Sequence, residues 1–155
     1  AQQTALYFAD STQMHDFRTL QTHEAPRTHS DLLFKGAVKD TAKSVYTGLI
    51  KITENATKSE AFQTNRNLTL SHGAWAESVP NLEIETNDVK CSHASTVGPI
   101  DDDQRFYLES RGIPTDVAER LVVFGFFDEV LERIPASSFT AELRAKVAAK
   151  LGRTV

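Results

Sequence analysis

The chain has 155 residues, a formal net charge of −4 and a sequence pI of about 5.7. The acidic balance argues against nucleic acid or an anionic membrane as the main partner, and no apolar run approaches the roughly 20 residues of a membrane-spanning helix. The single cysteine cannot form an internal disulfide and the start of the chain lacks the features of a signal peptide, so we expect a cytoplasmic location.

Composition changes near Pro99. Residues before it are rich in Thr, Ser, Asn and strand-forming types, whereas Ala, Leu, Glu and Arg dominate after it. This change predicts a mainly β protein with a helical C-terminal part, divided into a β domain over residues 1–100 and a helical domain over residues 101–155.

The β domain contains short runs with the length and the alternating polarity of β-strands, mostly separated by clusters of Asn, Gly, Asp or Pro. Three of these runs, at 49–52, 67–71 and 89–93, recur at intervals of roughly twenty residues, which is the size of one rung in a parallel β-helix or solenoid. An antiparallel sandwich of short strands is the alternative that the composition allows. On spacing alone, both architectures stay open.

The helical domain carries recognisable start and stop signals. Asp101 is placed to cap a first helix, and Gly112 is placed to end it in a left-handed conformation. A second helix is predicted over 114–134 and is ended by Pro135. A third begins near 138–140 and carries an apolar residue at every fourth position. We therefore expect a small α-helical bundle.

The chain's only cysteine, Cys91, stands two residues before His93. If the run at 89–93 is a strand, its period of two puts both side chains on one face. A thiolate and an imidazole on one face supply two ligands for a metal or a cluster, but a structural zinc site needs four, and no other ligand pair completes the set. A cysteine buried in a core or an interface, and a catalytic Cys–His pair, are the alternatives.

The predicted second helix contains the run LVVFGFF at 121–127, which is apolar on all sides of the helix. A surface helix normally has one apolar face, so this segment is either enclosed in its own domain or docked on a partner. Only two other helices are available to cover it, which favours a partner surface. The candidate partner-binding side chains are Leu121, Phe124, Phe126 and Phe127.

The sequence contains no Walker-type glycine-rich loop, GxSxG elbow, HExxH motif or Rossmann fingerprint. It shows no self-contained catalytic apparatus, and we expect a protein that is not an enzyme. A nucleophile built from Cys91 and His93 ranks last among the interpretations, because neighbours on one strand rarely orient correctly for that chemistry.

Three stretches of the sequence resemble one known family. They are VKCSHASTVGPIDDDQRFYLESRGI at 89–113, AERLVVFGFFDEVLERI at 118–134 and NRNLTLSHGAWAESVPNLEIETNDV at 65–89. All three are similar to the C-terminal part of SufD, a subunit type of the SUF iron–sulfur cluster assembly system. The resemblance extends over residues 30–135.

The strand-to-helix junction distinguishes two subunit types that share this fold. KCSHASTVGPID is similar to the SufD form KCSHGATVGQID, whereas SufB-type sequences look like EHEATTSKI. The departures from the SufD form are Ala94 and Ser95 in place of Gly-Ala, and Pro99 in place of Gln. They leave both the thiol and the imidazole in place.

The resemblance implies a right-handed parallel β-helix followed by a helical C-terminal domain. It implies a non-catalytic scaffold that pairs with SufB through the β-helix and docks the SufC ATPase on its C-terminal helices. A transient iron–sulfur cluster shared with SufB would form at the SufB–SufD interface, where the family position matching His93 lies with that of Cys91 beside it. The missing ligands would then come from another chain.

Members of this family are longer, with an N-terminal helical region and more β-helix rungs, so we expect this chain to be a C-terminal fragment without the N-terminal rungs. An open β-helix end exposes unpaired strand edges, which predicts self-association into a homodimer. The alternative function is a β-solenoid interaction or structural module that needs no metal.

Overall fold

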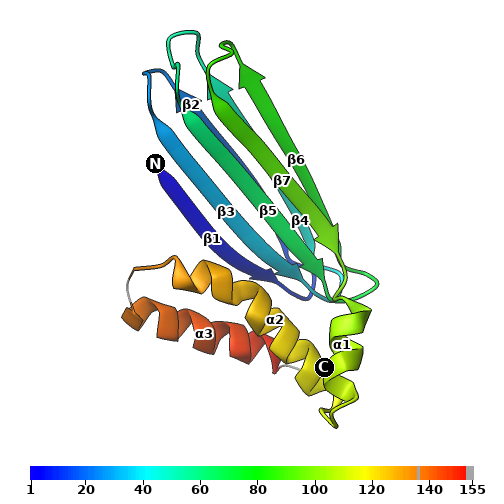
Figure 1. Cartoon of the computed structure of the whole chain (residues 1–155). Coiled ribbons are helices and arrows are strands. Elements are labelled where there is room, and N and C mark those ends of the chain that lie inside the picture. Colours follow the sequence, from blue (N-terminus) through cyan, green and yellow to red (C-terminus); the bar gives the residue numbers. More distant parts are fainter. Residues whose placement is uncertain (136, 153–155) are drawn as a thin grey trace.

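The computed structural model describes residues 1–135 and 137–152, in which seven β-strands precede three α-helices (Figure 1). The strands are β1 (Gln2–Ala9), β2 (Met14–His23), β3 (His29–Val38), β4 (Lys43–Ile52), β5 (Glu60–Thr69), β6 (Trp75–Ile84) and β7 (Lys90–Gly98). The helices are α1 (Asp102–Glu109), α2 (Thr115–Glu132) and α3 (Ser137–Leu151). The predicted fold class, mainly β with a helical C-terminal part, is confirmed. Positions 153–155, the end of the expected helical domain, lie outside the described residues.

The strands alternate between two parallel sheets, so the chain coils as a solenoid. One sheet has the order β1-β3-β5-β7 and the other the order β2-β4-β6, and the pairings between neighbours are parallel. Each turn of the coil contributes one strand to each sheet (Figure 1). The solenoid prediction is therefore confirmed, and the antiparallel sandwich is excluded.

The length of one turn differs from the sequence-based expectation. Gln2 pairs with Asp31, and Lys43 pairs with Trp75, so strands one turn apart are offset by 29 to 32 residues. The expected interval of about twenty residues was wrong. It came from apolar runs in β4, β5 and β7, and β4 lies in the other sheet. The interval from β4 to β5 is therefore a step from one sheet to the other within the coil, whereas the interval from β5 to β7 is one full turn.

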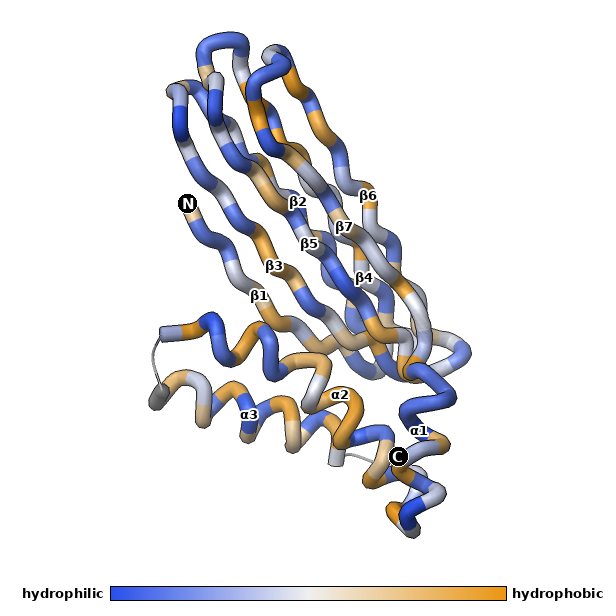
Figure 2. Tube along the Cα trace, viewed as in Figure 1, coloured by the Kyte–Doolittle hydropathy of each residue, from blue (hydrophilic) through white to orange (hydrophobic). Residues whose placement is uncertain are grey.

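Alternate residues of each strand point into the solenoid and build its interior. The alternation is complete in β4, where Ser44, Tyr46, Gly48, Ile50 and Ile52 are all buried. Hydrophilic and hydrophobic residues are mixed along the coil (Figure 2), and the buried positions carry both apolar and polar side chains. Full burial of a large apolar side chain contributes about 1.5–3 kcal/mol relative to exposure, so these inward columns supply much of the stability of the coil.

The interior also contains a hydrogen-bonded polar cluster. The Tyr7 hydroxyl lies 3.0 Å from Ser44 Oγ and donates to Asn67 Oδ1, while Asn67 Nδ2 donates to Asn65 Oδ1 at 2.8 Å. Burial raises the pKa of the Tyr7 hydroxyl, which stays a donor at neutral pH. A side chain at Gly36 would overlap the Tyr7 ring, so glycine is required for this packing. Mutual pairing makes the burial of these polar groups tolerable.

Helix α2 packs against β1 and β3, with α3 beside it (Figure 1). One apolar cluster joins the strands to both helices; its buried members are Phe8, Ala37, Val123, Phe127, Leu131 and Val147. Phe127 is fully buried in this cluster, so its assignment to a partner-binding surface is corrected to a core position. The sequence argument counted only helices as cover for α2 and left out the sheet.

Lys35 ties α2 to β3 electrostatically. The Lys35 side chain is 4% exposed, and its ammonium group donates to the carbonyl oxygen of Phe126 at 2.8 Å and lies 2.6 Å from the Glu129 carboxylate. The hydrogen bond from Lys35 holds the pKa of Glu129 below its ordinary value. A buried ammonium group requires such pairing, so these contacts keep α2 in one position on the sheet.

The predicted helix signals are confirmed at both ends of α1. The Asp101 carboxylate accepts hydrogen bonds from the backbone N–H groups of Asp103 and Gln104. Gly112 has a φ of +81°, in the left-handed region that glycine tolerates. None of the described helices is long and apolar enough to cross a membrane.

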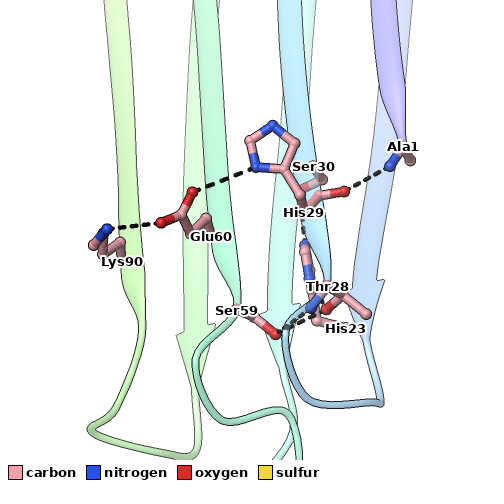
Figure 3. Close-up of polar contacts among 8 residues, drawn as sticks. All are labelled: Ala1, His23, Thr28, His29, Ser30, Ser59, Glu60 and Lys90. Carbon is pink, nitrogen blue, oxygen red and sulfur yellow. Dashed lines mark hydrogen bonds and ion pairs between the residues drawn. The ribbon is translucent and has the colours of Figure 1, made fainter.

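His23 is buried at the turn between β2 and β3 (Figure 3). Its ring nitrogens lie 2.6 Å from Thr28 Oγ1 and 2.7 Å from Ser30 Oγ. A neutral imidazole satisfies both contacts, because one nitrogen donates and the other accepts. Burial, followed by the positive charge of the N-terminus and by His29, lowers the pKa of His23.

We therefore predict that acid destabilises the solenoid through His23. Because its folded-state pKa lies below the unfolded value of about 6.5, the unfolded chain takes up this proton first, and the free energy of unfolding falls as the pH drops below that value. Urea unfolding at about pH 7.5 and about pH 5.5 should show a smaller acid-induced loss in His23→Gln than in the wild type. The exposed loop variant His72→Gln should keep the wild-type loss. An identical loss in all three proteins would contradict the prediction.

Candidate functional site

The last turn of the solenoid is formed by β6 and β7, which are the terminal strands of their sheets. Each pairs with one neighbour, β4 and β5 respectively, and within the described residues no strand pairs with their other edges. The backbone N–H and C=O groups on these free edges can accept another strand.

The solenoid interior becomes exposed at this last turn. Leu82 and Ile84 of β6 stack in register on Ile50 and Ile52 of β4, which are fully buried, yet they are themselves 37% and 43% exposed. Val97 of β7 is 43% exposed. These side chains belong to interior columns, and no further turn covers them in the described chain. Apolar surface of this kind marks an interaction site.

Cys91 and His93 lie at the same place, on the side of β7 that faces the interior. Cys91 pairs with Ala61 and packs on the apolar cluster that Ala61 shares with the isoleucines of β4, and His93 pairs with Gln63. The expectation that a strand would put both on one face is met. We call this surface the open end; its residues are Leu82, Ile84, Cys91, His93 and Val97.

The two candidate residues differ in burial. The Cys91 thiol is half-buried, and burial raises its pKa, so it is protonated at neutral pH and a weak nucleophile. His93 is exposed. In the residues that the structure describes, no group of three or more His, Cys, Asp or Glu side chains is arranged to hold a metal ion. Cys91 and His93 offer two ligands of the types used for iron–sulfur clusters, and the others would have to come from a second chain.

Ion pairs on the outer face flank the open end. Lys90 Nζ lies 2.7 Å from Glu60 Oε1, and the other oxygen of Glu60 lies 3.7 Å from His29 Nδ1, which forms a ladder across three turns (Figure 3). On the other sheet, Lys51 lies 3.1 Å from Glu83. Exposed pairs of this kind add only about 0–1 kcal/mol each. Their charges at the free edges nevertheless oppose indiscriminate strand pairing.

A second exposed apolar surface lies between α1 and α2. Leu121 is 48% exposed and lines a shallow groove with Tyr107, Leu108 and Val122. Phe106, on the same helix as Tyr107, is 69% exposed. We call the surface lined by Tyr107, Leu108, Leu121 and Val122 the helical groove. Sequence analysis missed the contribution of α1, although the run FYL at 106–108 was a signal for it.

The four side chains expected to bind a partner are thus divided by the structure. Leu121 is at the surface, Phe124 and Phe126 are partly buried against the shared core, and Phe127 is fully buried. Of these four side chains, only Leu121 is largely exposed.

Comparison with known proteins gives the family. A family model described as "SUF system FeS cluster assembly, SufBD core domain" matches residues 1–126. The chain belongs to this family. The iron–sulfur cluster assembly protein SufD of Escherichia coli is 37% identical over 136 residues, and SufD of Bacillus subtilis is 37% identical over 139 residues. The resemblance to SufD is therefore confirmed.

A mycobacterial relative is more similar in sequence. An iron–sulfur cluster assembly SufBD family protein of Mycobacterium tuberculosis is 45% identical over an alignment of 155 positions. The alignment covers 95% of this chain and 39% of the relative. The matches to the two SufD proteins cover 88% and 90% of this chain but 32% of each of those proteins. The chain thus spans 32–39% of the length of these SufBD relatives.

We predict that Cys91 reacts slowly with iodoacetamide in this chain, and more slowly still if a SufB-type subunit covers the open end, as proposed below. Burial both raises the pKa of the thiol and restricts access. The labelling rate, followed by mass spectrometry, should fall on addition of the partner. As a control, Ser92→Cys in a Cys91→Ser background places the thiol on the exposed, outward side of β7 and should label rapidly. Equal rates for Cys91 with and without the partner would count against an interface position.

Proposed function

We propose that this chain is part of a scaffold subunit for iron–sulfur cluster assembly that is not itself an enzyme. It pairs with a SufB-type subunit through the open end and docks a SufC-type ATPase on its helices. A transient cluster, the cargo of the system, is shared with the SufB-type subunit at Cys91 and His93. With its single free thiol, the protein acts in the cytoplasm.

The observation that supports this proposal most directly is the coincidence of three features at the open end. Interior apolar side chains are exposed there, two strand edges are unpaired, and the chain's only thiol lies two residues from an imidazole. Pairing this end with a similar end of a second solenoid of the same family would bury apolar surface and satisfy the free edges together. It would also bring further ligands to Cys91 and His93.

A β-solenoid interaction module that needs no metal is the second candidate. It is favoured by the incomplete ligand set within the described chain. Both candidates use the open end for partner binding, and they differ in whether the imidazole of His93 matters once the partner is bound. A homodimer of this chain would serve either function.

The helical groove supports the docking of the ATPase. It combines exposed aromatic and aliphatic residues, the types enriched in protein interfaces, on helices that follow the open end directly in the chain. Because Lys35 and the shared core hold α2 on the sheet, movement of a docked ATPase would reach the solenoid as a rigid-body shift.

We predict that His93→Ala abolishes cluster assembly and leaves both partners bound. Anaerobic reconstitution with iron and sulfide, in the presence of the SufB-type subunit, would be followed by visible absorption, and complex formation by size-exclusion chromatography. The exposed, outward variant Ser92→Ala is the matched control and should assemble clusters normally. Assembly at the wild-type rate in His93→Ala would favour the metal-independent module instead.

We also predict that Leu121→Glu weakens binding of the SufC-type ATPase at least tenfold and leaves the fold intact. Loss of a hot-spot residue at the centre of an interface costs about 2 kcal/mol or more, and about 1.4 kcal/mol is tenfold in affinity. Phe127→Ala provides the contrast: its cavity in the shared core should lower the free energy of unfolding by about 3–5 kcal/mol. Calorimetric titration and urea unfolding measure the two effects, and unchanged affinity in a folded Leu121→Glu protein would show that the groove is not the docking surface.

A further inference from the structure

Gln63 of β5 is an exception in the polar interior. Its side chain is 2% exposed, and neither its amide nitrogen nor its amide oxygen has a hydrogen-bond partner. The neighbouring inward amides, Asn65 and Asn67, are hydrogen-bonded to each other. A buried polar group without a partner costs about 1–3 kcal/mol, so an orphaned amide in an otherwise paired cluster requires an explanation.

The register of the sheet places this amide beside the open end. Gln63 pairs with His93 on the adjacent parallel strand, and both side chains lie on the inward side. Neighbouring strands are about 4.8 Å apart, so the two methylene groups of glutamine are long enough to bring its amide to the imidazole ring. Cys91 lies one inward position away along β7.

In the structure, the Gln63 amide reaches across the interior to the other sheet. It lies against Gly48 of β4, where a side chain of any other residue would overlap it. The space left by Gly48 thus holds the Gln63 amide without giving it a hydrogen bond. Rotation of the side chain toward His93 would exchange this unpaired position for a paired one, which gains the free energy that the orphaned amide otherwise loses.

We propose that Gln63 is a positioning residue for His93. The amide oxygen of Gln63 accepts the N–H of one ring nitrogen of His93, and the lone pair of the other nitrogen is then directed at iron. This inference rests on the proposed role of His93 in cluster assembly. Histidines that bind metals commonly donate their second N–H to a carbonyl or carboxylate, which fixes the tautomer and the ring orientation. A neutral amide can do this inside the solenoid without burying a charge.

The chain contains a matched control for this proposal. Gln21 of β2 is also buried, at 7% exposed, and its amide likewise has no hydrogen-bond partner. It lies in the other sheet, where it pairs with Ile50, two turns below Leu82. Replacing either glutamine with leucine removes an orphaned amide from the interior, so both variants should fold, but only the change at Gln63 touches the neighbour of His93.

The decisive measurement is the tautomer ratio of His93, read from the ring ¹⁵N chemical shifts of this chain by NMR. We expect Gln63→Leu to shift the ratio and Gln21→Leu to leave it unchanged. Gln63→Glu retains an acceptor oxygen and should keep the wild-type tautomer. An unchanged ratio in a folded Gln63→Leu protein, or a shift of equal size in Gln21→Leu, would overturn the proposal.

Reconstitution with a SufB-type partner separates this inference from the proposed function. We expect Gln63→Leu to reduce iron binding at the shared site about tenfold or more, and Gln21→Leu to have no effect. If His93→Ala assembles clusters normally, the proposed function fails. If His93 is required but Gln63→Leu leaves both the tautomer ratio and iron binding unchanged, only the positioning role fails.

Discussion

In-register stacking of parallel strands, one turn of the solenoid on the next, is the constraint on which the remaining structure depends. Side chains alternate between interior and surface, so a slip of one residue in any pair would exchange the two sets. Specific contacts oppose such a slip: the Tyr7 ring occupies the space that a side chain at Gly36 would fill, and Lys90 meets Glu60 across adjacent turns. The same register places Cys91 over the apolar cluster and His93 beside Gln63.

The change in composition near Pro99 predicted the class of the fold, and the two-residue period of a strand predicted the face that Cys91 and His93 share. The length of the turn was not predictable in the same way. Interior positions of β5 carry Gln63, Asn65 and Asn67, so hydrophobicity does not mark the inward column there. A repeat that is defined by backbone pairing, while its interior residues vary between apolar and amide, leaves only a weak periodic signal in the sequence.

The apolar run of α2 shows a different limit. Its composition indicated that most of the helix had to be covered, but composition does not say by what. In the structure, the sheet supplies the cover: Phe127 packs between strands and α3, while Leu121, six residues earlier, remains at the surface. The division follows from the direction in which α2 crosses β1 and β3, a tertiary feature that no local pattern contains. The sequence alone does not explain a charged residue at Lys35 inside a strand. The structure explains it, because the carboxylate of Glu129 on α2 pairs with it.

The positions of the open end and the helical groove bear on how two partners could be bound at once. The open end belongs to β6 and β7. Helix α2 packs on β1 and β3, which lie toward the opposite edge of the sheet that ends in β7. Glu129 of α2 reaches both Lys35 of β3 and, at 3.8 Å, Arg66 of β5, the strand that pairs with β7. Helix α2 is therefore attached by ion pairs to two adjacent strands, β3 and β5. Backbone hydrogen bonds connect β5 in turn to β7. Parallel strands in register resist independent sliding, so α2 and the sheet form one connected unit, and the outer edge of β7, the strand that holds His93, pairs with no strand in the described residues.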